Sequence, residues 1–210
     1  AITCGSETAG GIRNLYVHDC VFDNTGVGIR FKTRRPRGGG GENLLYERIR
    51  MNLKGDAFNW DMLGSATYVG DLAKRLPPRP LNRLTPHYKN ITARDLIITT
   101  TRMFIKVHGI PESPMSNLLI DNAEVRSRGL ISIADADGIT LKDLRIESRD
   151  SLINILDGRN ILFDRVQFSV PGGALFTKVS GPLSDSIRFE NTAPEKPVNW
   201  KEKSWYRMDH

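Results

Sequence analysis

The sequence has few of the features that mark several common classes of protein. Two cysteines among 210 residues are too few for a disulfide scaffold or a cysteine-based zinc site. No apolar run approaches the roughly 18 residues expected of a membrane-spanning helix. Residues 1–30 also lack the basic-then-apolar order of a signal peptide. We therefore expect a soluble chain with no membrane partner, and any export signal would lie outside it.

The charge and composition are those of a folded domain with a basic surface. Thirty Lys and Arg residues against 24 Asp and Glu residues give a net charge of +6 and a pI near 9.5. A hydrophobic fraction of 39% excludes disorder as a description of the whole chain. The basic balance favours an anionic partner, but charge alone does not distinguish nucleic acid, membrane and acidic polymer.

A phrase in which Asn precedes an apolar residue recurs seven times along the chain. Its copies begin at Asn14, Asn43, Asn90, Asn117, Gly138, Asn160 and, more weakly, Ser186. The spacings between successive starts are 29, 47, 27, 21, 22 and 26 residues, so only the second is anomalous. Repeats of this length are typical of solenoids, in which each repeat buries its inner face against its neighbours.

The hydrophobic pattern inside each repeat predicts three short strands. Apolar residues alternate, break at a polar pair such as His18-Asp19, and then alternate again, which indicates two strands joined by a bend. A third strand follows, for example at residues 28–32 and 104–107. We therefore predict an all-β fold, a right-handed parallel β-helix of about seven coils. The recurring Asn suits the turns, because it tolerates a left-handed backbone and can pair with Asn one coil away.

The second spacing contains an insertion. Its excess length places a loop excursion at residues 55–88. The best helix candidate within it runs over residues 69–76 and is stopped by the proline-rich residues 77–80. We expect this segment to leave the coil stack and return to it.

The end of the sequence departs from the repeat as well. Residues 193–210 break the pattern and contain Trp200, Trp205 and Tyr206. The ends of a solenoid need covering, so we expect this tail to fold over the last coil as a cap. The predicted organisation is one β-helix over residues 1–192 and a capping tail over residues 193–210.

The first residues align with the third-strand phrase, so the first coil starts in its middle. Strand edges and the inner apolar residues Ile2, Leu15, Val17 and Ile29 would then be open at this end. We expect self-association through the N-terminal end into a dimer or trimer, because closure hides every edge. The alternative is a monomer in which residues 1–11 fold across the opening.

Several short phrases, in a fixed order, resemble those of a known family. They are Gly5-Ser6-Glu7, Gly10-Gly11-Ile12-Arg13-Asn14, Ile29-Arg30-Phe31-Lys32-Thr33, Gly38-Gly39-Gly40-Gly41-Glu42-Asn43, Tyr68-Val69-Gly70 and Gly109-Ile110-Pro111-Glu112-Ser113-Pro114. The chain resembles glycoside hydrolase family 28, the polygalacturonases and related pectin-degrading enzymes, in its Bacteroidetes-type members. The resemblance extends over essentially the whole chain.

This resemblance implies binding rather than catalysis. Family members are inverting hydrolases with an Asn-Thr-Asp phrase, an Asp-Asp pair and a Gly-His-Gly phrase, and none of these occurs here. The Arg-x-Lys phrase that grips the galacturonate carboxylate in the family does match, at Arg30 and Lys32. The chain thus looks like the C-terminal portion of such an enzyme. The implied partner is acidic pectic polysaccharide, the implied location is secreted or periplasmic, and we expect no cofactor and little or no hydrolysis.

Strand alternation gives Arg30 and Lys32, hereafter the clamp, a chemical rationale. They flank the inward-facing Ile29 and Phe31, so both point outward, about 6–7 Å apart along the strand. A guanidinium binds a carboxylate bidentately, while an ammonium adds a mobile point charge. In a following coil Lys106 falls near the position equivalent to the clamp and is followed by His108, while Asn59 and Asp61 lie in between. These four residues complete the predicted floor of a substrate groove.

Other functions are less well supported by the residues. Arg34, Arg35 and Arg37 beside residues 38–41 form a basic loop that could cradle phosphate, but a phosphate-binding loop of that kind ends in Gly-Lys-Ser/Thr before a helix. No helix-turn-helix, paired zinc ligand or stacked aromatic motif supports a nucleic-acid partner. A function from another class is a structural or self-assembling solenoid with a vestigial sugar groove.

Four acids fall near the clamp, namely Glu7, Asp56, Asp61 and Asp71. An inverting glycosidase needs two carboxyl groups roughly 6.5–9.5 Å apart around a water molecule, and no spacing makes two of these a pair. We interpret them as turn and loop acids and predict no catalytic residue. The four histidines lack metal-ligand spacing, so we predict no metal site.

Cys4 and Cys20 fall in or near the first coils. We expect both to be small buried hydrophobic residues. A disulfide is an alternative, but stacked coils do not guarantee the Cα separation of roughly 4.4–6.8 Å that it requires.

Overall fold

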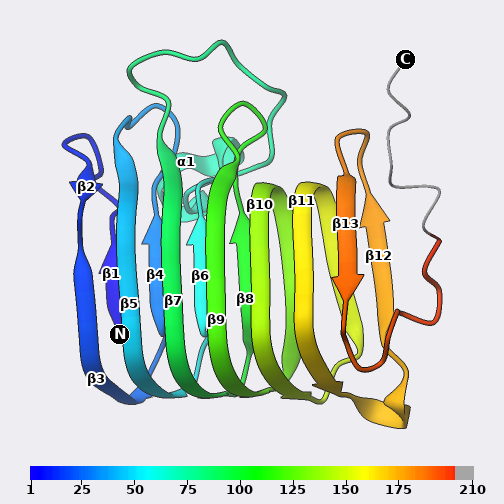
Figure 1. Cartoon of the computed structure of the whole chain (residues 1–210). Coiled ribbons are helices and arrows are strands. Elements are labelled where there is room, and N and C mark those ends of the chain that lie inside the picture. The colour runs from blue at the N-terminus through cyan, green and yellow to red at the C-terminus, as the bar shows by residue number, and fades with distance from the viewer. Residues whose placement is uncertain (202–210) are drawn as a thin grey trace.

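The computed structural model describes residues 1–201, which form a parallel β-helix. In Figure 1 the chain descends along the front strands, rises along the back strands and advances from left to right, which is a right-handed winding. The ladders between successive coils are parallel. The predicted all-β, right-handed parallel β-helix is therefore confirmed.

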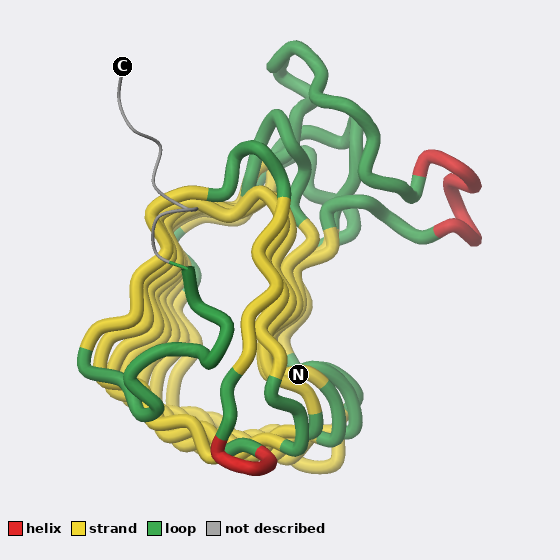
Figure 2. The backbone as a smooth tube through the Cα atoms, turned by 90° about the vertical axis from the view of Figure 1, so that its right-hand side faces the viewer, coloured by secondary structure: helices red, strands yellow, loops and turns green. Residues whose placement is uncertain are grey.

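The elements follow one another along the chain in a simple order. They are β1 (Ile2–Cys4), β2 (Ile12–Arg13), β3 (Tyr16–Thr25), β4 (Ile29–Lys32), β5 (Gly40–Leu53), β6 (Phe58–Asp61), α1 (Ala66–Val69), the 3-10 helix η1 (Gly70–Leu72), β7 (His87–Thr100), β8 (Met103–His108), β9 (Met115–Ser127), β10 (Gly129–Ser148), β11 (Leu152–Ser169), the 3-10 helix η2 (Pro171–Gly173), β12 (Phe176–Ser180) and β13 (Asp185–Glu190). Figure 2 views the stack end-on and shows the coils superposed, with α1 and η1 projecting to one side.

One face of the β-helix is a sheet that receives a short segment from every coil. It contains β1, β4, β6, β8, the first residues of β10 and β11, and β12. Its side chains alternate as predicted, because Ile29 and Phe31 are fully buried while Arg30 and Lys32 are only partly buried. This face carries the candidate site.

The other faces come from the long strands, which bend at residues with a left-handed backbone. Two columns of such residues run along the stack, with φ between 52° and 57°. The first column holds Asn14, Asn43, Asn90, Asn117, Asn160 and Ser186, and the second holds Asp19, Arg48, Asp95, Asn122, Asp143, Arg165 and Asn191. Asn and Asp adopt this conformation more readily than other non-glycine residues, which is why they recur in the phrase.

The asparagine ladder predicted from the repeat is present in the first four coils. The amide of Asn117 donates to Oδ1 of Asn90 at 3.0 Å, and Asn90 donates in the same way to Asn43 at 3.1 Å. Asn43 is 3.4 Å from Asn14. Gly138, with a φ of 77°, takes the next place in the column and ends the ladder.

The core is a continuous stack of apolar side chains inside the coils. In the early coils it is aromatic, since Phe31 stacks on Trp60 with ring centroids 4.7 Å apart and meets Tyr88 edge-on at 5.2 Å. Fully burying each large side chain contributes roughly 1.5–3 kcal/mol. Each coil therefore depends on its neighbours for its stability, as expected of a solenoid.

The excursion is narrower than predicted. Within residues 55–88, β6 stays in the sheet and pairs with β4 and β8, and β7 already begins at His87. The segment that leaves the stack spans residues 62–86. The hydrophobic alternation of residues 57–60 was the better guide to this boundary than the spacing of the repeat.

The helix predicted at residues 69–76 is wrong in position. The observed α1 ends at Val69, where the prediction begins, and η1 follows. The Ser65 side chain accepts a hydrogen bond from the N–H of Thr67 and caps the helix, and Gly70, with a φ of 52°, ends it. Local capping therefore fixes this helix ahead of the proline-rich stop.

The N-terminal coil differs from the expectation in one respect. Ile29 is completely buried, because β1 lies on it with Ile2 as its register partner. The expectation that Ile29 is open at this end is wrong, whereas Ile2, Leu15 and Val17 are partly buried against the core. The partial burial of these three residues does not test whether the chain self-associates, so self-association stays a prediction.

At the other end the coil pattern continues just past residue 192. Ala193 pairs with Gln167 in parallel, and the Trp200 ring packs edge-on against Phe189 with centroids 5.0 Å apart. Trp205 and Tyr206 lie outside the described residues. The capping role of residues 193–210 and the boundary at 192 therefore stay predictions.

Both cysteines are free thiols, Cys4 buried and Cys20 partly exposed. The expectation of burial thus holds fully for Cys4 alone. Burial raises the pKa of the Cys4 thiol, and the nearby Tyr46 hydroxyl offsets part of that rise. Within residues 1–201, no helix is long and apolar enough to cross a membrane.

Candidate functional site

The six residues predicted as the groove floor lie together on three neighbouring strands. Strand register places Arg30, Asn59 and Lys106 side by side in one row across β4, β6 and β8. The same register places Lys32, Asp61 and His108 in a second row, two residues further along each strand. Neighbouring strands lie about 4.8 Å apart, so each row spans about 10 Å. The structure thus brings all six residues into one small patch.

The fold leaves the Arg30 guanidinium largely unused. Its only ion-pair partner among the described residues is Asp61, with Nη2 3.8 Å from Oδ2. That separation exceeds a hydrogen bond, and Nε is buried without a partner within the described part of the chain. One third of the Arg30 side chain is exposed, so the donors that it offers to a carboxylate are those of the terminal guanidinium nitrogens.

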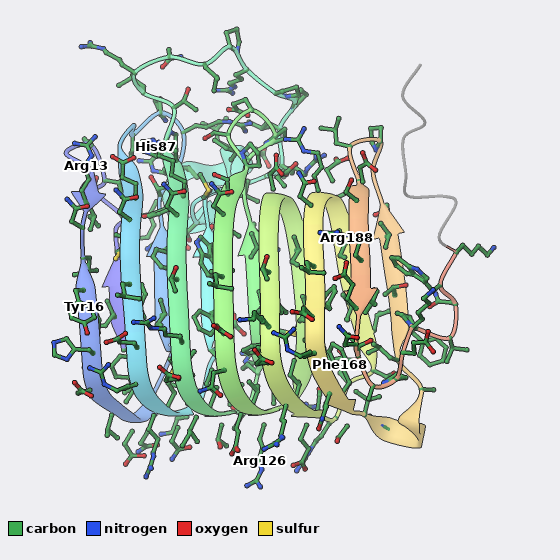
Figure 3. The ribbon with its side chains drawn as sticks, in the orientation of Figure 1. Arg13, Tyr16, His87, Arg126, Phe168 and Arg188 are labelled. Carbon is green, nitrogen blue, oxygen red and sulfur yellow. The ribbon has the colours of Figure 1, made fainter. Side chains whose placement is uncertain are left out.

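Lys32 and Lys106 form no ion pair with any described residue. With Arg30 they place three cations against the single acid Asp61 in the patch. Several other cations of the molecule are paired, as Figure 3 allows the reader to follow for two labelled residues: Arg13 pairs with Glu42 at 2.6 Å, and Arg126, at the lower edge, pairs with Glu147 at 3.3 Å. Lys32 and Lys106 thus differ from these in having no acid among the described residues to neutralise them.

His108 is the titratable group of the patch. Burial is the main cause that lowers its pKa below 6.5, and the charge of Lys106 adds to that effect. Asp61, Asp56 and Asp135 oppose the shift without reversing it. The imidazole is therefore neutral at pH 7, where it can donate one hydrogen bond and accept another.

Asp61 has a second, structural contact. Its Oδ1 accepts hydrogen bonds from the N–H groups of Leu63 and Gly64 at 3.3 and 3.2 Å. These bonds fix the turn by which the chain leaves β6 and enters the excursion. Asp61 therefore links the floor of the groove to the segment that rises beside it.

The other three candidate acids also have partners in the fold. Asp56 accepts from the Asn59 amide at 2.8 Å, at the opposite end of β6 from Asp61. Asp71 pairs with Lys74 and Glu7 with Arg37, both at the surface. Asp61 is the last residue of β6 and Asp56 lies two residues before its start, so about 10 Å of strand and a bend separate them, which is more than the roughly 6.5–9.5 Å of an inverting pair.

The basic loop after β4 is mostly engaged in holding the structure. Arg35 makes a bidentate ion pair with Glu112, and only 11% and 4% of the two side chains are exposed. Arg37 pairs with Glu7 at 2.8 Å and donates to the carbonyl of Ser6. Arg34 forms no ion pair with a described residue. Of the three arginines, only Arg34 is thus available to a ligand.

The sequence reasoning missed a cluster that ties the excursion to later coils. Arg75 donates through Nε and Nη2 to the buried carboxylate of Asp135, both at 2.7 Å, and Nη2 also reaches Asp157. Asp135 and Asp157 both have left-handed backbones, at φ values of 54° and 49°. In the sequence the only signal is that both acids follow the third apolar segment of their repeat, and this position does not indicate that they bind an arginine 60 or 82 residues earlier.

Among residues 1–201, no group of three or more His, Cys, Asp or Glu side chains is arranged to hold a metal ion. The chemistry of the patch is therefore that of cations, one carboxylate, an amide and a neutral imidazole. Such a set can bind an acidic, hydroxyl-rich ligand.

Comparison with known proteins gives one distant similarity. No family model matches the chain, and no solved structure matches it. A probable polygalacturonase of Vitis vinifera is 27% identical over 124 residues, which cover 59% of this chain. The matched part is 24% of that relative, so the chain spans about a quarter of its length. The chain is thus similar, distantly and over part of its length, to a protein of a polygalacturonase-like family.

Proposed function

We propose that the patch binds the carboxylates of galacturonate units in acidic pectic polysaccharide. The observation that carries this proposal is the strand register, which sets the free donors of Arg30 beside Lys32 and Lys106 on one outward face. The similarity to a probable polygalacturonase supports the choice of a polysaccharide partner.

The residues have complementary tasks in this proposal. Arg30 takes one uronate carboxylate with its guanidinium fork, and Lys32 adds a point charge about 6–7 Å along the strand. The Asn59 amide and the neutral His108 imidazole exchange hydrogen bonds with sugar hydroxyls. Asp61, 3.8 Å from Arg30, competes with the ligand and keeps the affinity moderate.

We infer little or no hydrolysis by this chain. Each of the four nearby carboxylates holds a backbone or side-chain partner, as described above, and none is placed as an acid and base pair. The assay is reducing-end release from polygalacturonate. Turnover that persists through purification and disappears in Asp61→Ala would contradict the inference.

A titration tests the binding proposal. Galacturonate and its short oligomers are titrated into wild type, the double variant Arg30→Ala/Lys32→Ala and a control, Arg50→Ala/Lys54→Ala. The control removes the same charge from exposed residues on another face. We expect the clamp variant to bind at least tenfold more weakly, and salt to weaken binding to wild type. Equal affinities in all three proteins would instead favour a structural solenoid with a vestigial groove.

Self-association through the N-terminal end remains part of the proposal. Ile2, Leu15 and Val17 are only partly buried, and covering 300 Å² of apolar surface is worth roughly 7 kcal/mol before the cost of association. Light scattering over a concentration series measures the mass. A monomer mass at every concentration would exclude the predicted dimer or trimer.

A further inference from the structure

A furrow of about 370 Å³ lies at the corner where the chain passes from β9 into β10. It shares no residue with the patch, and Arg126, which belongs to its wall, is labelled at the lower edge of Figure 3. A water molecule occupies roughly 30 Å³ of liquid, so the furrow has room for a ligand of several heavy atoms. The proposed function does not use this space.

Two rows of exposed side chains form the walls of the furrow. Strand register places the first row side by side, namely Thr99, Arg126 and Glu147. The second row lies two residues further along each coil and holds Thr101, Arg128 and Arg149. Neighbouring coils lie about 4.8 Å apart and residues two apart on a strand about 6–7 Å, so the two rows face one another across a narrow gap.

The second row breaks the charge pattern of the first. Arg126 faces Glu147 of the next coil at 3.3 Å, whereas Arg128 and Arg149 are neighbours of like charge. Neither forms an ion pair with a described residue. The acid that follows, Asp150, uses Oδ1 to accept a backbone N–H at 3.1 Å. Like charges in neighbouring strands are destabilising, so the fold alone gives no reason for this pair of arginines.

A buried hydroxyl at the same corner has no partner. Ser127 lines the furrow and is 8% exposed, and its Oγ makes no hydrogen bond within the described part of the chain. The matching hydroxyls of Thr100 and Ser148 accept from the N–H two residues further on, at 3.2 and 3.1 Å. At Ser127 that N–H belongs to Gly129 and goes to the carbonyl of Arg102 at 3.0 Å instead. A bound acceptor would satisfy the free hydroxyl.

The corner is also tighter than those beside it. One residue, Arg128, joins β9 to β10, whereas two residues join β7 to β8 and three join β10 to β11. The ladder still reaches the arginines, because the N–H of Arg149 donates to the carbonyl of Ser127 at 3.2 Å. The two arginines are therefore set side by side by backbone pairing.

We propose that the furrow binds a doubly charged tetrahedral oxyanion: inorganic sulfate or phosphate, or the phosphate group of a monoester. Arg128 and Arg149 each bind two of its oxygens through the guanidinium fork. Ser127, after rotation about χ1, donates its hydroxyl to one of the same oxygens. A carboxylate has one charge and two oxygens, so it neutralises only one of the two arginines. The site thus differs from the patch in ligand class and does not rest on the proposed function.

Calorimetry at low ionic strength tests the binding. All proteins carry Arg30→Ala/Lys32→Ala, so that the clamp is not a second anion site. The furrow variants are Arg128→Ala/Arg149→Ala and Arg128→Lys/Arg149→Lys, and the matched control is Arg50→Ala/Arg83→Ala, at exposed arginines elsewhere. We expect inorganic sulfate and inorganic phosphate to bind the parent and the control at least tenfold more tightly than acetate.

The variants report which groups bind the ion. The double alanine variant should lose at least tenfold in sulfate affinity, and the double lysine variant should keep part of it, because it retains the charges without the forks. Ser127→Ala should weaken binding about fivefold, which corresponds to one hydrogen bond. Galactose 6-phosphate identifies the source: an affinity equal to that of phosphate indicates an ester group, and an affinity at least tenfold weaker indicates the free ion.

Thermal unfolding gives an independent readout. Arg149→Glu places an acid beside Arg128, as in the first row. At low ionic strength and without sulfate, we expect it to raise the midpoint by about 2–4 °C, because an attractive cross-strand pair replaces a repulsive one. Sulfate should then raise the midpoint of the parent by more than that of Arg149→Glu.

Three results would overturn the proposal. The first is a sulfate affinity that survives in Arg128→Ala/Arg149→Ala. The second is acetate that binds as tightly as sulfate, since a dianion site must prefer the dianion. The third is an equal rise of the midpoint with sulfate in every protein, which is the general effect of a salt excluded from protein surfaces.

Discussion

The early and late coils of this β-helix differ in how the chain leaves the sheet that carries the candidate site. In the coils of β10 and β11, a single residue with a left-handed backbone, Asp135 or Asp157, turns the chain directly into the next face. In the coils of β4, β6 and β8, loops at residues 33–39, 62–86 and 109–114 occupy the same place and project together at the top of Figure 1. The late coils are thus a plain scaffold, and the early coils carry the irregular segments that surround the patch.

Cations stack on acids of the preceding coil in both regions, as Arg165 does on Asp143 at 2.6 Å in the late coils and Arg48 does on Asp19 at 2.6 Å in the early coils. On the face that carries the patch, Lys32 and Lys106 have no such partner among the described residues, and neither has Arg34 just after β4. These three cations lie beside the loops of the early coils, where a ligand can reach them.

Arg75 connects the two regions. It lies in the excursion of an early coil and binds the turn acids of two later coils. The cluster raises the pKa of the Arg75 guanidinium further above its ordinary value, chiefly through hydrogen bonds to Asp135. The regular coils therefore also serve as an anchor for the irregular segment beside the patch.

The largest expected loss of stability comes from a substitution in the core of the late coils. Phe163 is fully buried and stacks on Phe189 with centroids 4.5 Å apart. We expect Phe163→Ala to lower the free energy of unfolding by about 3–5 kcal/mol, measured by denaturant titration. Phe176→Ala, at a residue that is 38% exposed, is the control and should cost about 1 kcal/mol or less. Equal losses would mean that the late coils do not depend on their stacked core.

The next largest expected effect is a loss of stability in the loops of the early coils. Arg35→Ala leaves Glu112 buried without its partner, which typically costs about 3 kcal/mol or more. We expect hydrogen exchange to accelerate at residues 33–39 and 109–114, while the late coils keep their protection. Arg34→Ala is the matched control and should leave exchange unchanged. Uniform acceleration over the whole chain would show that the loops and the coils unfold as one unit.

The Glu112 carboxyl makes that contact dependent on pH. Burial alone would raise its pKa, but the hydrogen bonds from Arg35 lower it below 4.5 overall. A carboxyl with a lowered native pKa stabilises the fold above its unfolded pKa, and that contribution is lost as the pH falls through the native value. Loop protection in wild type should therefore weaken in acid, and in Arg35→Ala it should not show this dependence.

A smaller effect tests the turns that both regions share. Asn90 has a φ of 56°, and it donates to Asn43 and accepts from Asn117 in the ladder. Asn90→Gly removes the ladder bonds but keeps a backbone suited to this conformation, whereas Asn90→Ala adds strain. We expect the alanine variant to be less stable than the glycine variant by about 1 kcal/mol in thermal unfolding. An alanine variant at least as stable as the glycine variant would mean that the left-handed backbone does not select Asn at this position.

The smallest effect is the pH dependence of binding at the patch. His108 has a lowered pKa, so it becomes cationic only as the pH falls below 6.5. As the pH falls below 6.5, we expect the affinity for galacturonate to rise about threefold, until the uronate itself is protonated. This rise should be absent in His108→Gln. The same lowered pKa means that the unfolded chain binds the proton more readily, so the fold loses stability over this range. An affinity that falls between pH 7 and pH 5.5 would contradict the assignment.

Much of the fold could be predicted because its information is local. Alternation of apolar residues sets which side of a strand faces the core, and this correctly placed Arg30, Lys32, Asn59, Asp61, Lys106 and His108 on the outside. The recurring Asn marked the left-handed turns. The binding role of these six residues stays a prediction.

The position of the short helix and the burial of Ile29 could not be predicted in the same way. Four helical residues give too short a pattern to stand out beside a proline-rich stretch, and Ser65 capped them upstream. Ile29 is buried because β1, far away in sequence, covers it. Both errors arose where one short contact outweighs the periodic pattern.

The coil repeat, the strand faces and the outward line of cations follow from the order of the amino acids, because each depends on residues close together in the chain. Which of the cations lack a partner depends on contacts between distant segments. Arg34 and Arg35 are neighbours and look alike in the sequence, yet Arg35 is held by Glu112, 77 residues away, while Arg34 lines an open recess beside the clamp. An ion pair forms only between loops that lie in contact, and the stacking of the coils determines which loops do.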